Sequence, residues 1–279
     1  MSNLSREAIK VETVEAVQFH AIMTSGRTSP LRLTCERSGG EQVDVIAKFA
    51  GGQHCTKNSL CSEMIAAQLA VDLRLPIPLP LLVVWGDDFA SSIHDEAAKT
   101  VLAASSPPAF GSTYFSGGFA ILNNARKFAG DEQRQMALAI FFFDAMIGNA
   151  DRSTAKPNMV VRGDQYRIFD HELSFLDHEL IAKPPAPWVL GGFNPSLTPR
   201  KHIFATPLHK DVAKLDFVSL RDTWAGLSDA KIEAYEACLP DAWRIGATVP
   251  GFAIKRIKEC RSRIEECVTE CKRVLDAKT

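Results

Sequence analysis

Short runs in which apolar and polar residues partly alternate dominate the first fifty positions of the chain. Such runs occupy residues 11–23, 31–36 and 43–49, and a polar turn separates the first two. An alternation of period two gives a strand one apolar face, so these three runs predict β-strands. The spacing changes over residues 59–75, where apolar residues recur with helical periodicity until Pro76 ends the pattern.

The remainder of the chain changes from strand-like to mainly helical patterning. Residues 79–85 form a short apolar run that predicts a fourth strand. Residues 105–118 are rich in Ser, Pro and Gly and predict a loop, and residues 159–161 and 165–169 flank a turn and predict a hairpin. Helical spacing recurs over residues 91–104, 132–147, 212–220, 229–238 and 253–278. We therefore predict an α+β fold with two lobes, a small β-rich one over residues 1–86 and a larger helical one over residues 87–279.

Composition narrows the classes of function. Hydrophobic residues make up 46% of the 279 positions and charged residues 23%, as in ordinary globular proteins. The net charge of −1 gives no electrostatic argument for a nucleic-acid partner. No apolar run is long enough for a membrane span, and the N-terminus lacks the apolar core of a signal peptide. We therefore expect a cytoplasmic protein with no membrane partner; its oligomeric state is not indicated.

Seven cysteines are scattered along the chain without a Cys-x-x-Cys pair. Cys260, Cys267 and Cys271 are spaced by seven and four residues, which places them on one helical face. We interpret them as a small apolar stripe packed against the body of the protein. A metal site or an intermolecular disulfide is the alternative, although no histidine lies in that segment to complete a zinc site.

The strongest chemical signal lies between residues 148 and 172. Asp151 follows a predicted helix, Asn158 lies on the same loop, and Asp170 comes at the end of the following hairpin. One carboxylate can accept the proton of an attacking hydroxyl, while an amide and a second carboxylate can hold Mg²⁺ against phosphates. For His171 we favour a structural hydrogen-bonding role over metal ligation.

Two features nearer the N-terminus fit the same chemistry. Lys48 lies near the end of the third predicted strand and Glu63 lies in the following helix, the arrangement that holds ATP phosphates in kinases. The turn between the first two strands can offer backbone N–H groups and hydroxyls to phosphates, or can be a plain hairpin connection. The turn residues with this candidate role are Ser25, Gly26, Arg27, Thr28 and Ser29.

Taken in order over about residues 10–180, these motifs resemble the HipA-like atypical kinases, and in particular their short stand-alone members. The motifs that carry the resemblance are Gly26-Arg27-Thr28-Ser29-Pro30-Leu31, Val45-Ile46-Ala47-Lys48-Phe49, Ser62-Glu63-Met64-Ile65-Ala66, Leu75-Pro76-Ile77-Pro78, Phe110-Gly111-Ser112, Asn149-Ala150-Asp151-Arg152 and Phe169-Asp170-His171-Glu172.

The resemblance implies a bilobed protein-kinase-like fold that binds Mg²⁺ and ATP between its lobes. It implies that Lys48 contacts phosphates, that Glu63 holds Lys48, and that Asp151 is the catalytic base. Asp170 is then the main Mg²⁺ ligand. The implied activity is phosphorylation of Ser or Thr in a protein substrate, whose identity the resemblance does not supply.

One position departs from the family pattern. The metal-binding Asn of such loops is five residues after the catalytic Asp, and here that residue is Lys156, while Asn158 is seven residues after it. Either Asn158 is the ligand on a longer loop, or Lys156 replaces one metal site with a fixed cation that faces the phosphates. The second possibility keeps open a nucleotide-binding pseudokinase that acts as a scaffold.

A pure partner-binding protein with a kinase-like shell is the third hypothesis. Its contact surface could include the cysteine helix and a local basic cluster, which we otherwise interpret as a solvated face. The cluster consists of Arg200, Lys201, His202, His209 and Lys210.

Overall fold

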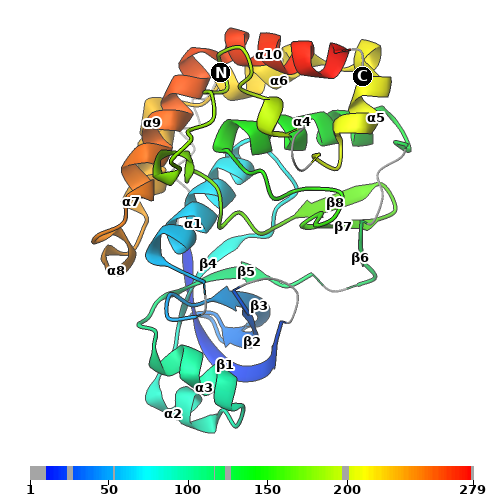
Figure 1. The fold of residues 1–279 in the computed structure, drawn as a ribbon. Helices are drawn as coiled ribbons and strands as arrows, with labels where there is room; N and C mark the ends of the chain where they lie inside the picture. The colour runs from blue at the N-terminus through cyan, green and yellow to red at the C-terminus, as the bar shows by residue number, and fades with distance from the viewer. Residues whose placement is uncertain are drawn as a thin grey trace, which may run out of the picture.

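The computed structural model describes residues 11–23, 28–52, 54–115, 117–122, 127–196 and 201–277. Figure 1 shows a β-rich N-terminal part at one end of the molecule and a larger helical part at the other. Each part has its own cluster of buried apolar side chains. The mixed α and β content predicted from the sequence, with strands first and helices later, is confirmed.

Five strands of the N-terminal part close into a small barrel. Their order around the barrel is β1-β2-β3-β5-β4, and the parallel pairing of β1 with β4 closes it. Alternate residues point inward, so Leu31, Leu33, Val45 and Val83 are fully buried in its core. The strands are β1 (Glu12–Ile22), β2 (Leu31–Glu36), β3 (Gln42–Lys48), β4 (Pro80–Val84) and β5 (Ala109–Thr113).

The fifth strand corrects the sequence prediction of a loop over residues 105–118. β5 pairs with both β3 and β4, so the β-rich part continues beyond residue 86, where we expected it to end. The glycine that weakened the strand pattern is needed there. A Cβ at Gly111 would lie 2.6 Å from Val83 Cγ2 and 2.9 Å from Val45 Cγ1, inside the barrel.

Two short helices replace the single helix predicted over residues 91–104. They are α2 (Asp87–Ser92) and α3 (Glu96–Ala103). Ile93 is in an extended conformation, and the Asp95 carboxylate accepts a hydrogen bond from the Ala98 amide at 2.9 Å, which starts a new helix. Phe89, Ile93 and Leu102 from this segment belong to the buried cluster of the barrel.

The helix α1 (Lys57–Asp72) connects the barrel to the helical part. Thr56 caps its first turn through reciprocal side-chain and backbone bonds with Ser59. Every residue from Ser59 to Ala70 is buried, since barrel strands lie on one side of the helix and α7, α8 and α9 lie on the other. The helix therefore holds Glu63 in a fixed position between the two parts.

The helical part surrounds α4 (Asp131–Ile147), whose three consecutive phenylalanines, residues 141–143, are fully buried. The helix predicted over residues 253–278 is instead two helices separated at Arg263, and the one over residues 212–220 begins as a 3₁₀ turn. The elements are α5 (Ala205–Lys210), α6 (Phe217–Ala225), α7 (Asp229–Ala237), α8 (Asp241–Arg244), α9 (Val249–Ser262) and α10 (Ile264–Asp276), with 3₁₀ turns at Asp177–Glu179, Asn194–Ser196 and Val212–Lys214.

The cysteines of these last helices form the packed stripe that we favoured. Cys260 on α9 and Cys267 and Cys271 on α10 are fully buried free thiols. Burial raises the pKa of the Cys271 thiol. Among the described helices, none combines the length and apolar character needed to cross a membrane.

A small second sheet positions the loop residues of interest. It consists of β6 (Ala120–Ile121), β7 (Met159–Arg162) and β8 (Gln165–Ile168), and the β7–β8 pair confirms the predicted hairpin. Asn158 immediately precedes β7, and Asp170 lies two residues after β8. The two ends of one hairpin thus lie together, and in Figure 1 the second sheet lies between the helical part and the barrel.

The close packing at Gly111 generates a stability prediction. A Gly111→Ala substitution should lower the free energy of unfolding by about 1–3 kcal/mol, because the added methyl group overlaps Val83 and Val45. Urea unfolding measures the change. Gly39→Ala is the matched control, since a Cβ there meets no atom within 4 Å. Equal stability of the two variants would contradict the tight barrel interior.

Candidate active site

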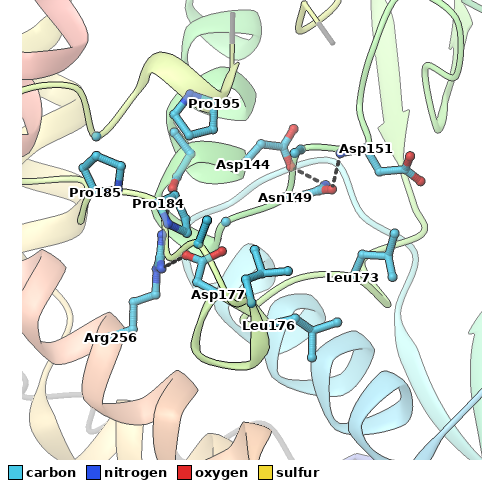
Figure 2. Close-up of a pocket in the computed structure, with 16 residues that line it drawn as sticks. Asp144, Asn149, Asp151, Leu173, Leu176, Asp177, Pro184, Pro185, Pro195 and Arg256 are labelled. Carbon is cyan, nitrogen blue, oxygen red and sulfur yellow. Dashed lines mark hydrogen bonds and ion pairs between the residues drawn. The ribbon is translucent and has the colours of Figure 1, made fainter. Parts of the chain in front are cut away.

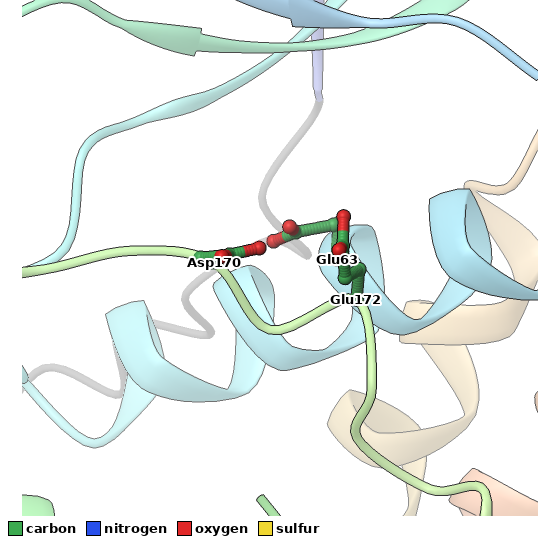
Figure 3. Close-up of side chains that lie close together, drawn as sticks. All are labelled: Glu63, Asp170 and Glu172. Atoms are coloured by element: carbon green, nitrogen blue, oxygen red, sulfur yellow. The ribbon is translucent and has the colours of Figure 1, made fainter. Parts of the chain in front are cut away.

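Three carboxylates surround the ammonium group of Lys48. Lys48 Nζ lies 2.5 Å from Glu63 Oε1, 2.6 Å from Asp170 Oδ1 and 2.8 Å from Glu172 Oε2. Lys48 ends β3, Glu63 comes from α1, and Asp170 and Glu172 follow β8. Figure 3 shows the three carboxylates converging from the helix and the loop. The predicted Lys48–Glu63 pair therefore exists, and Asp170 joins it.

Burial disfavours the charged forms of the side chains in this cluster. It disfavours the charged form of Lys48, but the three carboxylates outweigh it and raise the pKa of Lys48 well above its usual range. Burial raises the pKa of Glu63, which Lys48 only partly offsets. For Asp170, Lys48 and Lys156 overcome burial and hold the pKa well below its usual range. Lys48 therefore remains a cation and Asp170 an anion at neutral pH.

The turn between β1 and β2 is described only in part. Thr28 Oγ1 donates a hydrogen bond to Glu172 Oε2 at 3.0 Å, so this end of the turn reaches the Lys48 cluster. Ser29 adopts the left-handed backbone region with φ of 44°. The other predicted phosphate-binding residues of the turn, Ser25, Gly26 and Arg27, lie outside the described residues.

A second ion-pair cluster links Asp151 to Asp170. Lys156 Nζ lies 2.5 Å from Asp151 Oδ2 and 3.2 Å from Asp170 Oδ2. Asn158 donates its side-chain amide to Asp151 Oδ2 at 3.2 Å and has a left-handed φ of 46°. The structure therefore brings Asp151, Lys156, Asn158 and Asp170 together, and it places the lysine ammonium between the two aspartates.

A buried network under this loop was missed by sequence reasoning. The Asp144 carboxylate accepts hydrogen bonds from Arg152 Nε at 2.5 Å, Asn149 Nδ2 at 2.8 Å and His202 Nε2 at 3.0 Å. Arg152 in turn contacts His171 Nε2 at 2.9 Å. The residues on both sides of Asp151 are thus fixed to α4, which holds the Asp151 loop in place. A charged residue beside three consecutive phenylalanines was the available signal, because such a residue needs a partner.

His171 and His202 are both buried parts of this network. His171 is a buried hydrogen-bonding residue as we favoured, and burial together with Arg152 lowers its pKa to about 3. His202 is 3% exposed, so it does not belong to the solvated basic cluster predicted around residues 200–210. It instead pairs with Asp144, and the adjacent Ser153–His202 backbone bridge joins its segment to the Asp151 loop.

Two cavities lie near these clusters. The smaller, about 360 Å³, lies between the barrel and the second sheet, and Lys48, Glu63 and Asp170 line it. The larger, about 450 Å³, is lined by Asp151 and by residues of the loop that follows Leu173. They share no lining residue. We call them the Lys48 cavity and the Asp151 cavity.

The donor set fits a divalent cation. Glu63, Asp170 and Glu172 each offer an oxygen, and these oxygens lie within 4.8 Å of one another. When Asp151 is added and all four carboxylates are ionised, the described residues carry four negative charges near the two ammonium groups of Lys48 and Lys156. Carboxylate oxygens are the kind of ligand that Mg²⁺ prefers.

Comparison with known proteins decides the family. A model of the HipA-like kinase family matches residues 17–184, more than half of the chain and the whole of both charged clusters. The chain belongs to the HipA-like kinase family. Membership of this family supports a kinase-type function. A search of curated protein sequences found no match.

One solved structure supports the fold of this HipA-like kinase. The crystal structure of CtkA, a proinflammatory kinase of Helicobacter pylori, is similar with a TM-score of 0.52 at 12% identity, covering 93% of this chain and 98% of that one. The FAT and kinase domain of CtTel1 gives a TM-score of only 0.31 at 11% identity, covering 95% of this chain and 22% of that one. At such identity the CtkA likeness concerns the fold alone.

The buried His202 generates a pH prediction. Burial lowers the pKa of His202 from 6.5, and Asp144 offsets this only in part. Its Nδ1 accepts a hydrogen bond from the Phe204 amide, which requires the neutral ring. Below pH 6.5 the unfolded chain binds a proton that the folded chain does not. The free energy of unfolding should therefore fall with falling pH, by up to about 1.4 kcal/mol per unit from this residue.

Urea unfolding at about pH 7 and about pH 5 checks the sign. His202→Gln should show a shallower loss of stability than the unmodified protein, because glutamine does not titrate. His94→Gln at an exposed position is the control and should keep the full slope. A steeper or unchanged slope in His202→Gln would contradict this account.

Proposed function

We propose that this protein transfers the γ-phosphoryl group of Mg·ATP to a hydroxyl group, most directly that of Ser or Thr in a protein. The observation that carries the proposal is the position of Lys156. Its ammonium joins Asp151, which lines one cavity, to Asp170, which lines the other. Donor and acceptor can therefore approach from separate cavities and meet between these two carboxylates, as in a bilobed kinase.

The Lys48 cavity suits the nucleotide. Ile46, Phe110 and Val160 give it an apolar region that can cover a flat base, whereas Lys48 supplies a fixed cation for phosphates. Glu63 and Glu172 hold that ammonium in one place, so little conformational entropy is lost when the phosphates bind. Thr28, from the polar turn between β1 and β2, also lines this cavity.

Asp151 is the proposed catalytic base. The acceptor oxygen attacks the γ-phosphorus, and its proton passes to the Asp151 carboxylate. The bond from the γ-phosphorus to the oxygen bridging to the β-phosphate breaks, so ADP leaves with the bonding electrons. Lys156 neutralises charge on the transferring group, and the Asp144–Arg152 pair keeps the Asp151 loop from moving.

Magnesium is proposed to bind at the carboxylate cluster that includes Asp170. Asp170 is the proposed main ligand and Asn158 the second, which retains Asn158 as the metal-binding amide despite its longer spacing from Asp151. When bound, the metal neutralises phosphate charge. The proximity of Lys156 to Asp170 supports the idea that a fixed cation takes over part of that role.

The same lysine favours a second candidate function. Lys156 engages both Asp151 and Asp170, so nucleotide binding without transfer, as in a pseudokinase scaffold, is also consistent with this geometry. ATP would then stabilise the fold by mass action without being consumed. Measurement of binding and of transfer in the same samples separates the two functions.

Replacement of Asp151 tests the proposed transfer. Asp151→Asn should lower phosphate transfer from ATP by about 100-fold or more, because the base is lost. The ATP-induced rise in melting temperature should persist, since Asp151 does not line the Lys48 cavity. The exposed Asp164→Asn on the β7–β8 turn is the control. Unchanged transfer in Asp151→Asn would exclude the base role, and ATP binding without transfer by the unmodified protein would favour the pseudokinase.

Replacement of Lys156 tests its role as a fixed cation. Lys156→Asn should bind Mg²⁺ about tenfold more tightly, because one positive charge beside Asp170 is removed. Titration of the melting temperature with Mg²⁺ in the absence of ATP measures this. Lys156→Arg retains the charge and should leave the affinity near that of the unmodified protein. Equal affinities for Asn and Arg variants would show that the lysine does not compete with the metal.

A further inference from the structure

The Asp151 cavity has the composition of a site for an uncharged group. Apart from Asp151 itself, leucine and proline side chains provide much of its wall, and in Figure 2 Asp151 and Leu173 are drawn at one end. The segment after β8 separates it from the Lys48 cavity, since residues 169–171 line the latter and Leu173, Leu176 and Asp177 line the former. The leucines and prolines in the lining are Leu173, Leu176, Leu180, Pro184, Pro185 and Pro195.

The charged side chains of the lining are paired within the protein. Arg256 contacts Asp177 through Nη1 and donates its other two nitrogens to the backbone carbonyls of Met146 at 2.6 Å and Ala145 at 3.3 Å. Asp144 is paired with Arg152. Arg256 is the one arginine or lysine among the described lining residues, and each of its nitrogens already has a partner in the protein, so the cavity favours uncharged over phosphorylated or acidic acceptors.

Exposed apolar side chains continue outward from the cavity. Leu173 and Leu180 line it while remaining 42% and 51% exposed, and the neighbouring Ile181 is completely exposed. Leu190 is 79% exposed in the same connecting region. Large exposed apolar side chains gathered at a cavity indicate a protein contact, because a small acceptor within the cavity would leave those outside it uncovered.

We propose that the Asp151 cavity binds an extended peptide segment of the acceptor protein through an apolar side chain two residues from the phosphorylated Ser or Thr. In an extended segment, residues two positions apart point to the same side, about 7 Å apart. A hydroxyl directed at Asp151 therefore brings the side chain two residues away into the Leu173–Leu180 wall. This inference rests on the proposed kinase activity and adds a side-chain preference at one position of the acceptor.

Synthetic peptides with one Ser acceptor test the inference with the full-length protein and Mg·ATP. Leu, Ala, Lys or Asp is placed in turn at each of the two neighbouring positions on either side. Leu two residues from the Ser, on one side, should raise kcat/KM about tenfold over Lys or Asp there, about 1.4 kcal/mol. Leu directly beside the Ser should have a smaller effect.

Leu180→Asp should raise KM for the best Leu peptide about tenfold and remove the preference, while the KM for ATP stays unchanged. Val218→Asp is the matched control, because Val218 is 58% exposed on α6 and lines neither cavity.

Each other outcome identifies the statement that fails. Transfer to peptides without the two-residue preference, or with one that Leu180→Asp does not reduce, overturns this inference and leaves the kinase proposal intact. Transfer to an uncharged small alcohol such as glycerol but to none of the peptides overturns the assignment of a peptide acceptor. ATP binding with no transfer to any acceptor overturns the proposed function together with this inference.

Discussion

The arrangement of the site depends on the charge of one buried ammonium group. Lys48 comes from the barrel, whereas Glu63 comes from the connecting helix and Asp170 and Glu172 come from the loop after β8. Removal of one partner from such a buried ion pair commonly costs about 3–5 kcal/mol, because the remaining charge stays desolvated. The same cation that is suited to phosphates is thus required to keep the two parts of the molecule in register when no ligand is bound.

The carboxylates around Lys48 and Lys156 outnumber the two ammonium groups, which links the stability of the fold to the binding of a divalent cation. Among the described residues, four acidic side chains lie around two ammonium groups, and neighbouring carboxylates repel one another. A divalent cation relieves this repulsion. If Mg²⁺ binds as proposed, it would offset part of this negative charge and stabilise the protein by mass action.

Sequence reasoning predicted the parts of this arrangement that depend on local patterns. The elements that carry four of these residues were predicted correctly: a strand end for Lys48, a helix for Glu63, a loop for Asp151 and the end of a hairpin for Asp170. Strand alternation, helical spacing and loop signals each act over few residues. β5 was missed because Gly111 weakens a local strand pattern, although only a barrel closed by distant strands explains why it is there. Long-range pairing is not encoded in local periodicity.

The buried network around Asp144 was not predicted from the sequence, for a similar reason. His202 lies 58 residues from Asp144, and no spacing rule connects them. Lys156 was recognised as unusual, but its spacing did not show whether Lys156 or Asn158 occupies the metal position beside Asp170. In the structure Lys156 Nζ contacts both Asp151 and Asp170, and the Asn158 amide donates to Asp151.

The Asp144–His202 contact links the part of the chain that matches the family to a residue beyond it. The family match ends at residue 184, yet His202 and the backbone bridge beside it reach back to hold the Asp151 loop. A fragment cut at the edge of the match would keep all the proposed catalytic side chains and lose one of the supports that fix the Asp151 loop. The buried contacts that hold the Asp151 loop therefore extend beyond the part of the chain that matches the family.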